Sequence, residues 1–323
     1  MRPAGPATAT AGADAVHEGI VPTLAELVAL RAQVQRVPQP RQGRHGVHGP
    51  APSKLRGRGM EYAESRQYTI GDDVRRMDWR LTARSGRAHT KLFQAERERL
   101  TLLVADTAPE LYFGTRVRFK SVQAARAGAV AVWSALQSGD RIAALRGGEA
   151  AIAPGSGLRG AMRVLDALVR WYAQPPAANA PLAEALDHAQ RLLRPGAQLV
   201  VLADAGSAAQ VPTLRWTALA RHHQATLVLL QDPLEVAPPR RGLDFLAGGR
   251  RLRLALDLPG VRGRWEHAFL DPARELARSL PAMGWQLRLL STDAASADWL
   301  RPQACMDEAG TDAEAVPARS RVG

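Results

Sequence analysis

The chain has 323 residues, of which 46% are hydrophobic and 23% charged, a composition that excludes collagen-like, coiled-coil and wholly disordered proteins. No apolar run approaches the roughly 18 residues that a membrane span needs, and the first residues lack the apolar stretch of a secretory signal. A single cysteine, Cys305, cannot form an internal disulfide. We therefore expect a cytoplasmic protein.

The formal net charge of +12 is concentrated in two segments, residues 1–60 and residues 240–264. Basic tracts bind nucleic acids or acidic partners. Neither segment, however, intersperses aromatic residues among its arginines as single-strand binders do. A solvated surface is the simpler interpretation, and nucleic-acid binding through these segments is an alternative.

The first 58 residues contain one predicted helix. Residues 1–21 are rich in Ala, Gly, Thr and Pro without an apolar period, which predicts a disordered N-terminus. Thr23 and Glu26 have the spacing of a capping box, and a helical apolar period continues to about Val37. The following residues are basic and rich in proline. Residues 22–58 are therefore predicted to form a helix and a basic arm.

From Leu100 onward, apolar strands alternate with helical periods, which is typical of a parallel sheet with crossover helices. A Gly248-Gly249 pair predicts a hairpin within this region. The tail, residues 293–323, is predicted to be frayed. The expected strands are 100–105, 141–146, 199–203, 226–230, 252–256 and 285–290, and the expected helices are 122–136, 157–172, 181–193, 211–222 and 266–280.

Several catalytic signatures are absent or incomplete. Residues 155–160 fit G-x-G-x-x-G but lack the acidic residue about 20 positions later that a dinucleotide site needs, so a glycine-rich turn is expected. The sequence has no P-loop motif, no H-E-x-x-H zinc motif and no G-x-S-x-G. Nucleotide hydrolysis by a P-loop, zinc catalysis and serine hydrolysis have no positive support.

A dense group of charges lies between Arg58 and Trp79. Clustered carboxylates can bind Mg²⁺ for phosphodiester cleavage, which makes a metal nuclease built on the three aspartates an alternative. The arginines between them favour ion pairs that fold an irregular loop. The acidic residues are Glu61, Glu64, Asp72, Asp73 and Asp78, and the arginines are Arg66, Arg75 and Arg76.

The same stretch carries a family motif. Residues 66–79 have the form R-x-Y-x-x-G-D-D-x-R-x-x-D-W, and in this motif the chain resembles the bacterial family of domains of unknown function numbered fifty-eight. The resemblance extends from about residue 22 to residue 300. The signature residues, candidates for binding a partner, are Arg66, Tyr68, Gly71, Asp72, Asp73, Arg75, Asp78, Trp79 and Arg84. Further matches are Lys120, Asp232, Pro233 and Glu235.

That family is similar to von Willebrand factor A domains. The resemblance implies an α/β fold with a doubly wound, mostly parallel sheet over residues 100–292, preceded by the N-terminal helix and by a signature segment, residues 59–99, packed on the core. Family members are often encoded beside a MoxR-type AAA+ ATPase. The resemblance thus implies a non-catalytic protein-interaction module, an adaptor or co-chaperone of that ATPase in the assembly or maturation of protein complexes.

Von Willebrand factor A domains hold Mg²⁺ with a D-x-S-x-S motif after the first strand. Here Ala108 and Glu110 occupy the two serine positions, and an acid of the second strand persists as Asp204. The resemblance implies a degenerate magnesium site of Asp106, Glu110 and Asp204, weakened or lost, and no other cofactor. The alternative is that the two aspartates cap helix N-termini or bind loop amides.

Overall fold

A computed structural model of the chain describes residues 19–36, 60–69, 71–95, 99–176, 181–247 and 250–301. The chain forms two compact units, one of residues 1–39 and 100–323 and one of residues 40–99. The predicted disordered residues 1–18, the basic arm beyond residue 36 and the tail beyond residue 301 lie outside the described residues.

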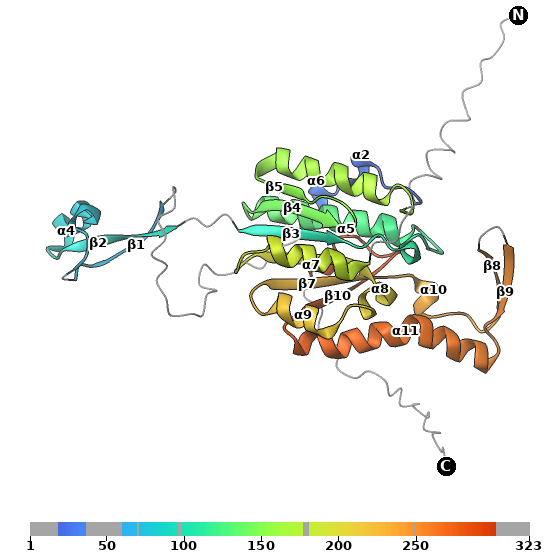
Figure 1. Cartoon of the computed structure of the whole chain (residues 1–323). Coiled ribbons are helices and arrows are strands. Elements are labelled where there is room, and N and C mark those ends of the chain that lie inside the picture. Colours follow the sequence, from blue (N-terminus) through green and yellow to red (C-terminus); the bar gives the residue numbers. More distant parts are fainter. Residues whose placement is uncertain are drawn as a thin grey trace, which may run out of the picture. The chain divides into compact units, whose positions relative to one another are not determined.

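The larger unit is built around a six-stranded sheet in the order β10-β7-β6-β3-β4-β5 (Figure 1). Its strands are β3 (Leu100–Ala105), β4 (Arg141–Arg146), β5 (Ile152–Gly155), β6 (Gln198–Asp204), β7 (Gln224–Gln231) and β10 (Gln286–Ser291). Neighbouring strands are parallel except that β5 is antiparallel to β4. The predicted α/β fold class with a mostly parallel sheet is confirmed.

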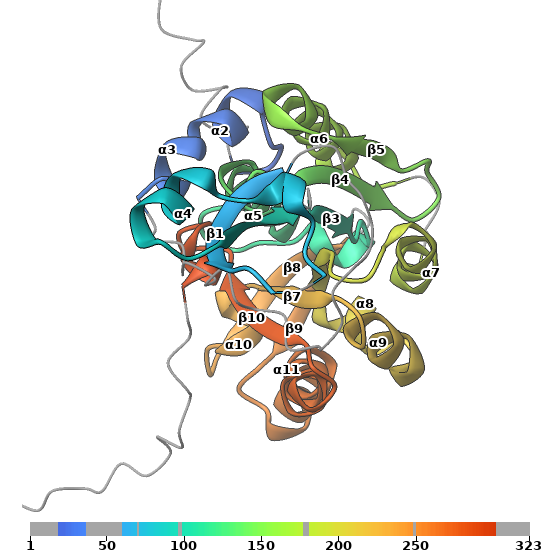
Figure 2. The ribbon, with the colours of Figure 1, turned by 90° about the vertical axis from the view of Figure 1, so that its left-hand side faces the viewer.

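Helices cover both faces of the sheet (Figure 2), as a doubly wound fold requires. One face carries α2 (Leu24–Ala29), α5 (Lys120–Gln137) and α6 (Gly157–Tyr172), and the other carries α7 (Leu182–Leu192), α9 (Thr213–Ala220) and α11 (Pro259–Ala282). The central strands are mostly apolar because both of their faces are buried. Successive β3 residues enter different cores: Leu103 packs with α5 and α6, and Leu102 with α7.

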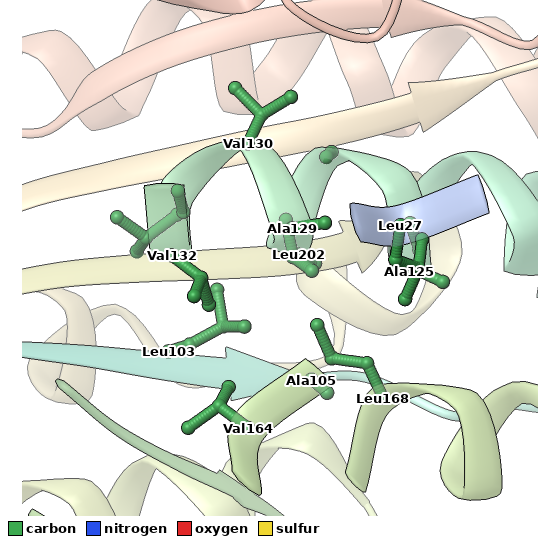
Figure 3. Packing of buried hydrophobic residues seen from close by; sticks show 14 of the residues in the cluster. Leu27, Leu103, Ala105, Ala125, Ala129, Val130, Val132, Val164, Leu168 and Leu202 are labelled. Carbon is green, nitrogen blue, oxygen red and sulfur yellow. The ribbon is translucent and has the colours of Figure 1, made fainter. Parts of the chain in front are cut away.

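We call the core between the sheet and helices α5 and α6 the first core. It explains why the N-terminal helix belongs to this unit. Leu27 of α2 is fully buried beside Ala125 of α5 (Figure 3). The indole Nε1 of Trp133 donates to the carbonyl of Leu27 over 2.9 Å. The Thr23 half of the predicted capping box is confirmed, since the Thr23 hydroxyl accepts from the Glu26 amide, whereas the Glu26 carboxylate pairs with Arg126. The predicted single helix is instead two short ones, α2 and α3 (Arg31–Val34).

Other elements differ from the sequence-based prediction. Strand β5 and α8 (Ala205–Ala209) were not predicted because both are too short to show a period. The Gly-Gly hairpin is confirmed as β8 (Gly242–Ala247) and β9 (Arg250–Ala255), a separate two-stranded sheet. The frayed tail is contradicted over residues 293–301, where a 3₁₀ helix, η3 (Asp298–Leu300), buries Trp299 against the first core.

The smaller unit is an antiparallel hairpin of β1 (Met60–Gln67) and β2 (His89–Ala95). Its connection contains the 3₁₀ helix η1 (Val74–Arg76) and α4 (Trp79–Ser85). The signature segment thus forms a compact unit of its own. That it packs on the core stays a prediction.

Within the part of the chain that the structure describes, no helix is both long enough and apolar enough to cross a membrane.

Candidate functional site at the carboxyl end of the sheet

Three aspartates stand where neighbouring strands end. Asp106 follows β3, Asp204 is the last residue of β6, and Asp232 follows β7. The carboxyl ends of these parallel strands form one edge of the sheet, which we call the crest. The strand order reverses between β3 and β6, and open α/β sheets bind ligands at such a switch point. The crest is therefore the expected position of a functional site.

A buried lysine lies among these acids. Lys120, the first residue of α5, is 1% exposed. Its Nζ lies 2.5 Å from Oδ2 of Asp204 and 2.6 Å from Oε1 of Glu235. Burial alone would lower the pKa of Lys120, but the two carboxylates raise it above its ordinary value. The side chain therefore stays an ammonium ion, and we call these three residues the lysine cluster.

The Asp-Pro-x-Glu match starts the short helix α10 (Pro233–Val236). The Asp232 carboxylate accepts from the Leu234 amide, and Oε2 of Glu235 accepts from the Asp232 amide over 2.8 Å. These reciprocal bonds form a capping box, with Pro233 at the first helical position, where its missing N–H costs nothing. The turn fixes Glu235 so that its second oxygen faces Lys120.

Asp232 also joins three segments of the chain. Its carboxylate accepts from the amide and hydroxyl of Thr115, over 2.9 and 2.5 Å, and from the hydroxyl of Thr292 over 2.8 Å. Burial alone would raise the pKa of Asp232, but its hydrogen bonds, including that from the Leu234 amide, hold the pKa below its ordinary value. The carboxylate is ionised and fully occupied by protein donors.

Asp106 is buried at the switch point, with 2% of its surface exposed. Oδ1 accepts from the Ala108 amide over 3.0 Å, and Oδ2 from the Asp204 amide over 3.3 Å. Burial raises its pKa to about 6, against the lowering effect of these bonds and of one from the Ser207 hydroxyl. Asp204 in turn caps α8, since its Oδ1 accepts from the Gly206 amide over 2.7 Å.

The placement of these acids does not fit the magnesium site implied by the resemblance. Each oxygen of Asp106 and Asp204 already accepts a hydrogen bond from the protein. Glu110 is exposed, and Lys120 supplies the positive charge beside Asp204. Among the described residues, no three His, Cys, Asp or Glu side chains are grouped to hold a metal ion. That the magnesium site of Asp106, Glu110 and Asp204 is weakened or lost stays a prediction.

A cavity of about 500 Å³ opens beside the lysine cluster, and we call it the crest pocket. One side is formed by the lysine cluster with Glu110 and Phe113, and the other by the β8–β9 hairpin and the first half of α11. Figure 1 shows this hairpin standing beyond the carboxyl ends of the strands, beside the start of α11. The apolar wall consists of Phe245, Leu252, Leu254, Val261, Trp265 and Phe269.

Trp265 connects the wall to the crest. Its Nε1 donates to the carbonyl of Glu235 over 3.1 Å. Its ring lies 4.5 Å from that of Phe269 and 6.0 Å from that of Phe245, centroid to centroid. The aromatic rings thus pack on one another and hold α11 against the α10 turn.

The signature motif of the smaller unit forms a tight turn after β1. Arg66 pairs with Asp72, with Nη2 2.7 Å from Oδ1, and its Nη1 donates to the hydroxyl of Thr69. The other oxygen of Asp72 accepts from the Thr69 amide and hydroxyl, and the amide bond is the main reason why the pKa of Asp72 is low. The Tyr68 hydroxyl donates to the Asp72 carbonyl, and Gly71 adopts a φ of 108° that only glycine tolerates well.

The other two signature aspartates start helices. Asp73 caps η1 by accepting from the Arg75 amide, and Asp78 caps α4 by accepting from the Leu81 amide and from the Ser65 hydroxyl. The predicted ion pairing holds for Asp72, while Asp73 and Asp78 act as caps. Arg75, Arg84 and Trp79 are exposed, Trp79 by 65%. The side chains of Glu61 and Glu64 lie outside the described residues.

The sequence comparisons agree with this motif. A family model described as "Protein of unknown function DUF58" matches residues 64–266. The chain belongs to this family. An uncharacterized protein of Mycobacterium bovis is 32% identical over 261 residues, which cover 79% of this chain and 80% of the relative. Uncharacterized proteins of two Mycobacterium tuberculosis strains match to the same extent. The predicted family is confirmed.

The structural comparison finds a protein titled von Willebrand factor type A from Catenulispora acidiphila. It is 12% identical, with a TM-score of 0.37, and the match covers 66% of this chain and 42% of that chain.

Some residues of this DUF58 crest were missed from the sequence alone. The sequence shows Lys120 only as a match to the family and gives it no role, because nothing near it in the sequence indicates that its partners lie 84 and 115 positions away. The capping box at Asp232–Glu235 was readable, since Asp-Pro-x-Glu is an N-terminal helix signal. For the apolar wall of the crest pocket, the only signal in the sequence is the alternation of apolar and polar residues in β8 and β9.

Proposed function

We propose that this DUF58 chain is a non-catalytic protein-interaction module that acts as an adaptor or co-chaperone of a MoxR-type AAA+ ATPase, in the assembly or maturation of protein complexes. The family resemblance supports the interaction role. The ATPase partner comes from the family resemblance. The cytoplasm is the proposed setting, which the single cysteine favours.

One observation carries the non-catalytic part of the proposal. At the crest, both oxygens of each buried carboxylate accept bonds from the protein, and the ammonium of Lys120 faces two of these carboxylates. A general acid, base or nucleophile has to reach a substrate. A polar centre that is internally saturated supports a structural role, in which it holds the loops of a docking surface.

The nuclease alternative is weaker for a similar reason. Asp73 and Asp78 cap separate helices, and Asp72 is paired with Arg66 inside its own turn. Incubating the full chain with DNA and RNA in magnesium tests this alternative directly. We expect no cleavage, and cleavage abolished by Asp72→Asn would replace the proposal with a nuclease.

Reconstitution tests the partner. The full chain is mixed with the MoxR-type ATPase of the same organism, and complex formation is followed by size-exclusion chromatography and by the rate of ATP hydrolysis. We expect a complex and a changed hydrolysis rate, with an unrelated AAA+ ATPase as the control. No complex at low salt together with an unchanged hydrolysis rate would contradict the adaptor role.

A further inference from the structure

The crest pocket is lined mainly by apolar side chains, and exposed apolar residues lie near it. The exposed large hydrophobic residues include Leu252 on the hairpin and Leu258 at the start of α11, both exposed by 52%. Beside them the cavity of about 500 Å³ is lined mainly by aliphatic and aromatic side chains. Its volume lies within the range of about 300–1,000 Å³ typical of ligand sites. Clustered exposed apolar side chains mark binding surfaces.

The hairpin separates apolar from basic side chains. In β8–β9, Phe245 is paired with Leu252 and both line the pocket. Strand alternation puts Arg251 and Arg253 on the opposite face. Arg264 of α11 lines the pocket and is exposed. Arg264 therefore places a positive charge in the pocket wall, and the outer face of the hairpin carries further arginines.

The basic segment of residues 240–264 thus has a defined place in the fold. Its exposed acidic residues are Asp244 and Asp257. Its exposed arginines are Arg240, Arg241, Arg250, Arg251, Arg253 and Arg264. None of these six arginines has an ion pair with another described residue. Arginines that the protein itself does not neutralise attract an acidic partner.

We propose that the crest pocket binds an acidic amphipathic segment of a partner protein. Apolar side chains of that segment enter the pocket against Leu252 and Phe269, and its carboxylates contact Arg264 in the pocket wall. Arg251, on the outer face of the hairpin, attracts the same acidic segment at longer range. Amphipathic helices dock in apolar grooves in this way, with anchor residues at helical spacing. The inference rests on the proposed function as a protein-interaction module, and it names the surface and the chemistry of the partner.

Charge on the inner side of the pocket favours a protein over a nucleic acid. Asp204, Glu235 and Glu110 border the cavity, and Lys120 offsets only one of these three negative charges. A nucleic-acid strand would bring a phosphate at every step towards these carboxylates. The aromatic rings of the wall pack on one another, whereas single-strand binders expose theirs to stack on bases. An amphipathic peptide keeps its acids at the basic rim and offers the pocket only apolar groups.

Fluorescence anisotropy of the full chain with labelled probes tests this inference. The main probe is a synthetic Leu/Glu peptide of about 18 residues, roughly five helical turns, with its leucines on one face. The comparison probes are a scrambled peptide of the same composition, a Leu/Lys peptide with the same pattern, and an oligothymidylate. We expect the patterned Leu/Glu peptide to bind at least about tenfold more tightly than each comparison probe, a difference of about 1.4 kcal/mol.

Matched variants locate the binding. Leu252 and Leu158 are both 52% exposed, but Leu158 lies in the first turn of α6 and does not line the pocket. Leu252→Gln should weaken binding of the Leu/Glu peptide about tenfold, and Leu158→Gln should leave it unchanged. Replacing both Arg251 and Arg264 by Gln should weaken it similarly. The control is the exposed pair Arg159 and Arg278, whose replacement by Gln removes the same net charge elsewhere.

The outcomes are separable from those of the ATPase experiment. Equal binding of the scrambled peptide, tighter binding of the oligothymidylate, or equal effects of Leu252→Gln and Leu158→Gln would overturn the inference. If the ATPase binds and Leu252→Gln does not weaken that complex, the interaction role holds and the crest pocket is the wrong surface. If the Leu/Glu peptide binds as expected and the ATPase does not, the surface holds and the proposed partner is wrong.

Discussion

The Nζ of Lys120 lies 2.6 Å from Oε1 of Glu235, although 115 positions separate the two residues along the chain. The same nitrogen lies 2.5 Å from Asp204, so one ammonium joins the start of α5 to the ends of β6 and α10. A buried charge is tolerated only when it is paired and hydrogen-bonded. The lysine cluster meets this requirement because the ammonium faces two carboxylates, and the second oxygen of each carboxylate accepts a backbone N–H bond, from Gly206 or from Asp232.

Removing the ammonium should be costly. Lys120→Met leaves two buried carboxylates without their cation, and breaking a buried pair in this way costs about 3–5 kcal/mol in the free energy of unfolding. Urea denaturation monitored by circular dichroism measures the loss. The matched control is Arg170→Met, which breaks an ion pair with Asp166 whose side chains are 58% and 61% exposed. A loss for Lys120→Met no larger than that of the control would contradict the structural role of the lysine cluster.

Magnesium should not stabilise the wild-type protein, since Lys120 provides the positive charge at the crest. A site that binds only the folded state adds about 2.7 kcal/mol to stability when the free ion is a hundredfold above its dissociation constant. We expect the thermal midpoint to be the same in excess magnesium and in EDTA, and isothermal calorimetry to record no binding heat. A midpoint that rises with magnesium and falls back on adding EDTA would show that the folded chain binds magnesium and would contradict this prediction.

The stability of the fold should depend on the protonation of Asp106. Its pKa rises from an ordinary value of 3.8 to about 6 in the folded chain because of burial. Between these values the native state binds more protons than the unfolded state, so this group's contribution to stability is full below pH 3.8 and falls as pH rises through about 6. The loss reaches about 3 kcal/mol above pH 6.

Carbon-13 NMR of the aspartate carboxyls measures the pKa of Asp106 directly, and assignment uses Asp106→Asn. The stability difference between wild type and Asp106→Asn, measured by urea denaturation across pH 4 to 7, isolates the contribution of this group. We expect the stability of the wild type relative to Asp106→Asn to fall as pH rises from 4 to about 6 and to level off above that value. A resonance of Asp106 that titrates near 3.8 would show that the carboxyl is hydrated.

The N-terminal helix should contribute to the stability of the larger unit. Leu27→Ala removes a fully buried side chain and should cost about 2–5 kcal/mol. Val28, the next residue, is 37% exposed, and Val28→Ala should cost much less. Urea denaturation compares the two. Equal effects would show that α2 does not pack into the core as Figure 3 depicts it.

The caps of the smaller unit predict a local effect. Asp78→Ala removes the acceptor for the Leu81 amide and the partner of the Ser65 hydroxyl. Amides in the first turn of α4 should then exchange their hydrogens several-fold faster, because a lost cap frays the first turn. Hydrogen-exchange NMR measures the rates. Arg80→Ala, an exposed change on the same helix, should leave them nearly unchanged, and an equal response to both variants would contradict the cap.

Local pattern was enough to predict most of the larger unit. The strand Leu100–Ala105 and the helix Gly157–Tyr172 lie where the sequence predicts them, because a buried parallel strand must be apolar on both faces and an amphipathic helix must repeat its apolar face. The turn between β5 and α6 follows from its glycines, since a Cβ on Gly160 would lie 2.4 Å from the carbonyl oxygen of Gly155. Such signals lie within a few residues of the structure that they specify.

The sequence by itself therefore determined the fold class, the family and the identity of the charged residues, all of which are encoded in short stretches. Only the tertiary structure brought Lys120 to Asp204 and Glu235, and only it put the basic hairpin beside an apolar pocket. The reason is physical. The parallel crossovers bring strand ends together from distant positions, and the energy of a buried charge depends on those long-range neighbours, which no local period encodes.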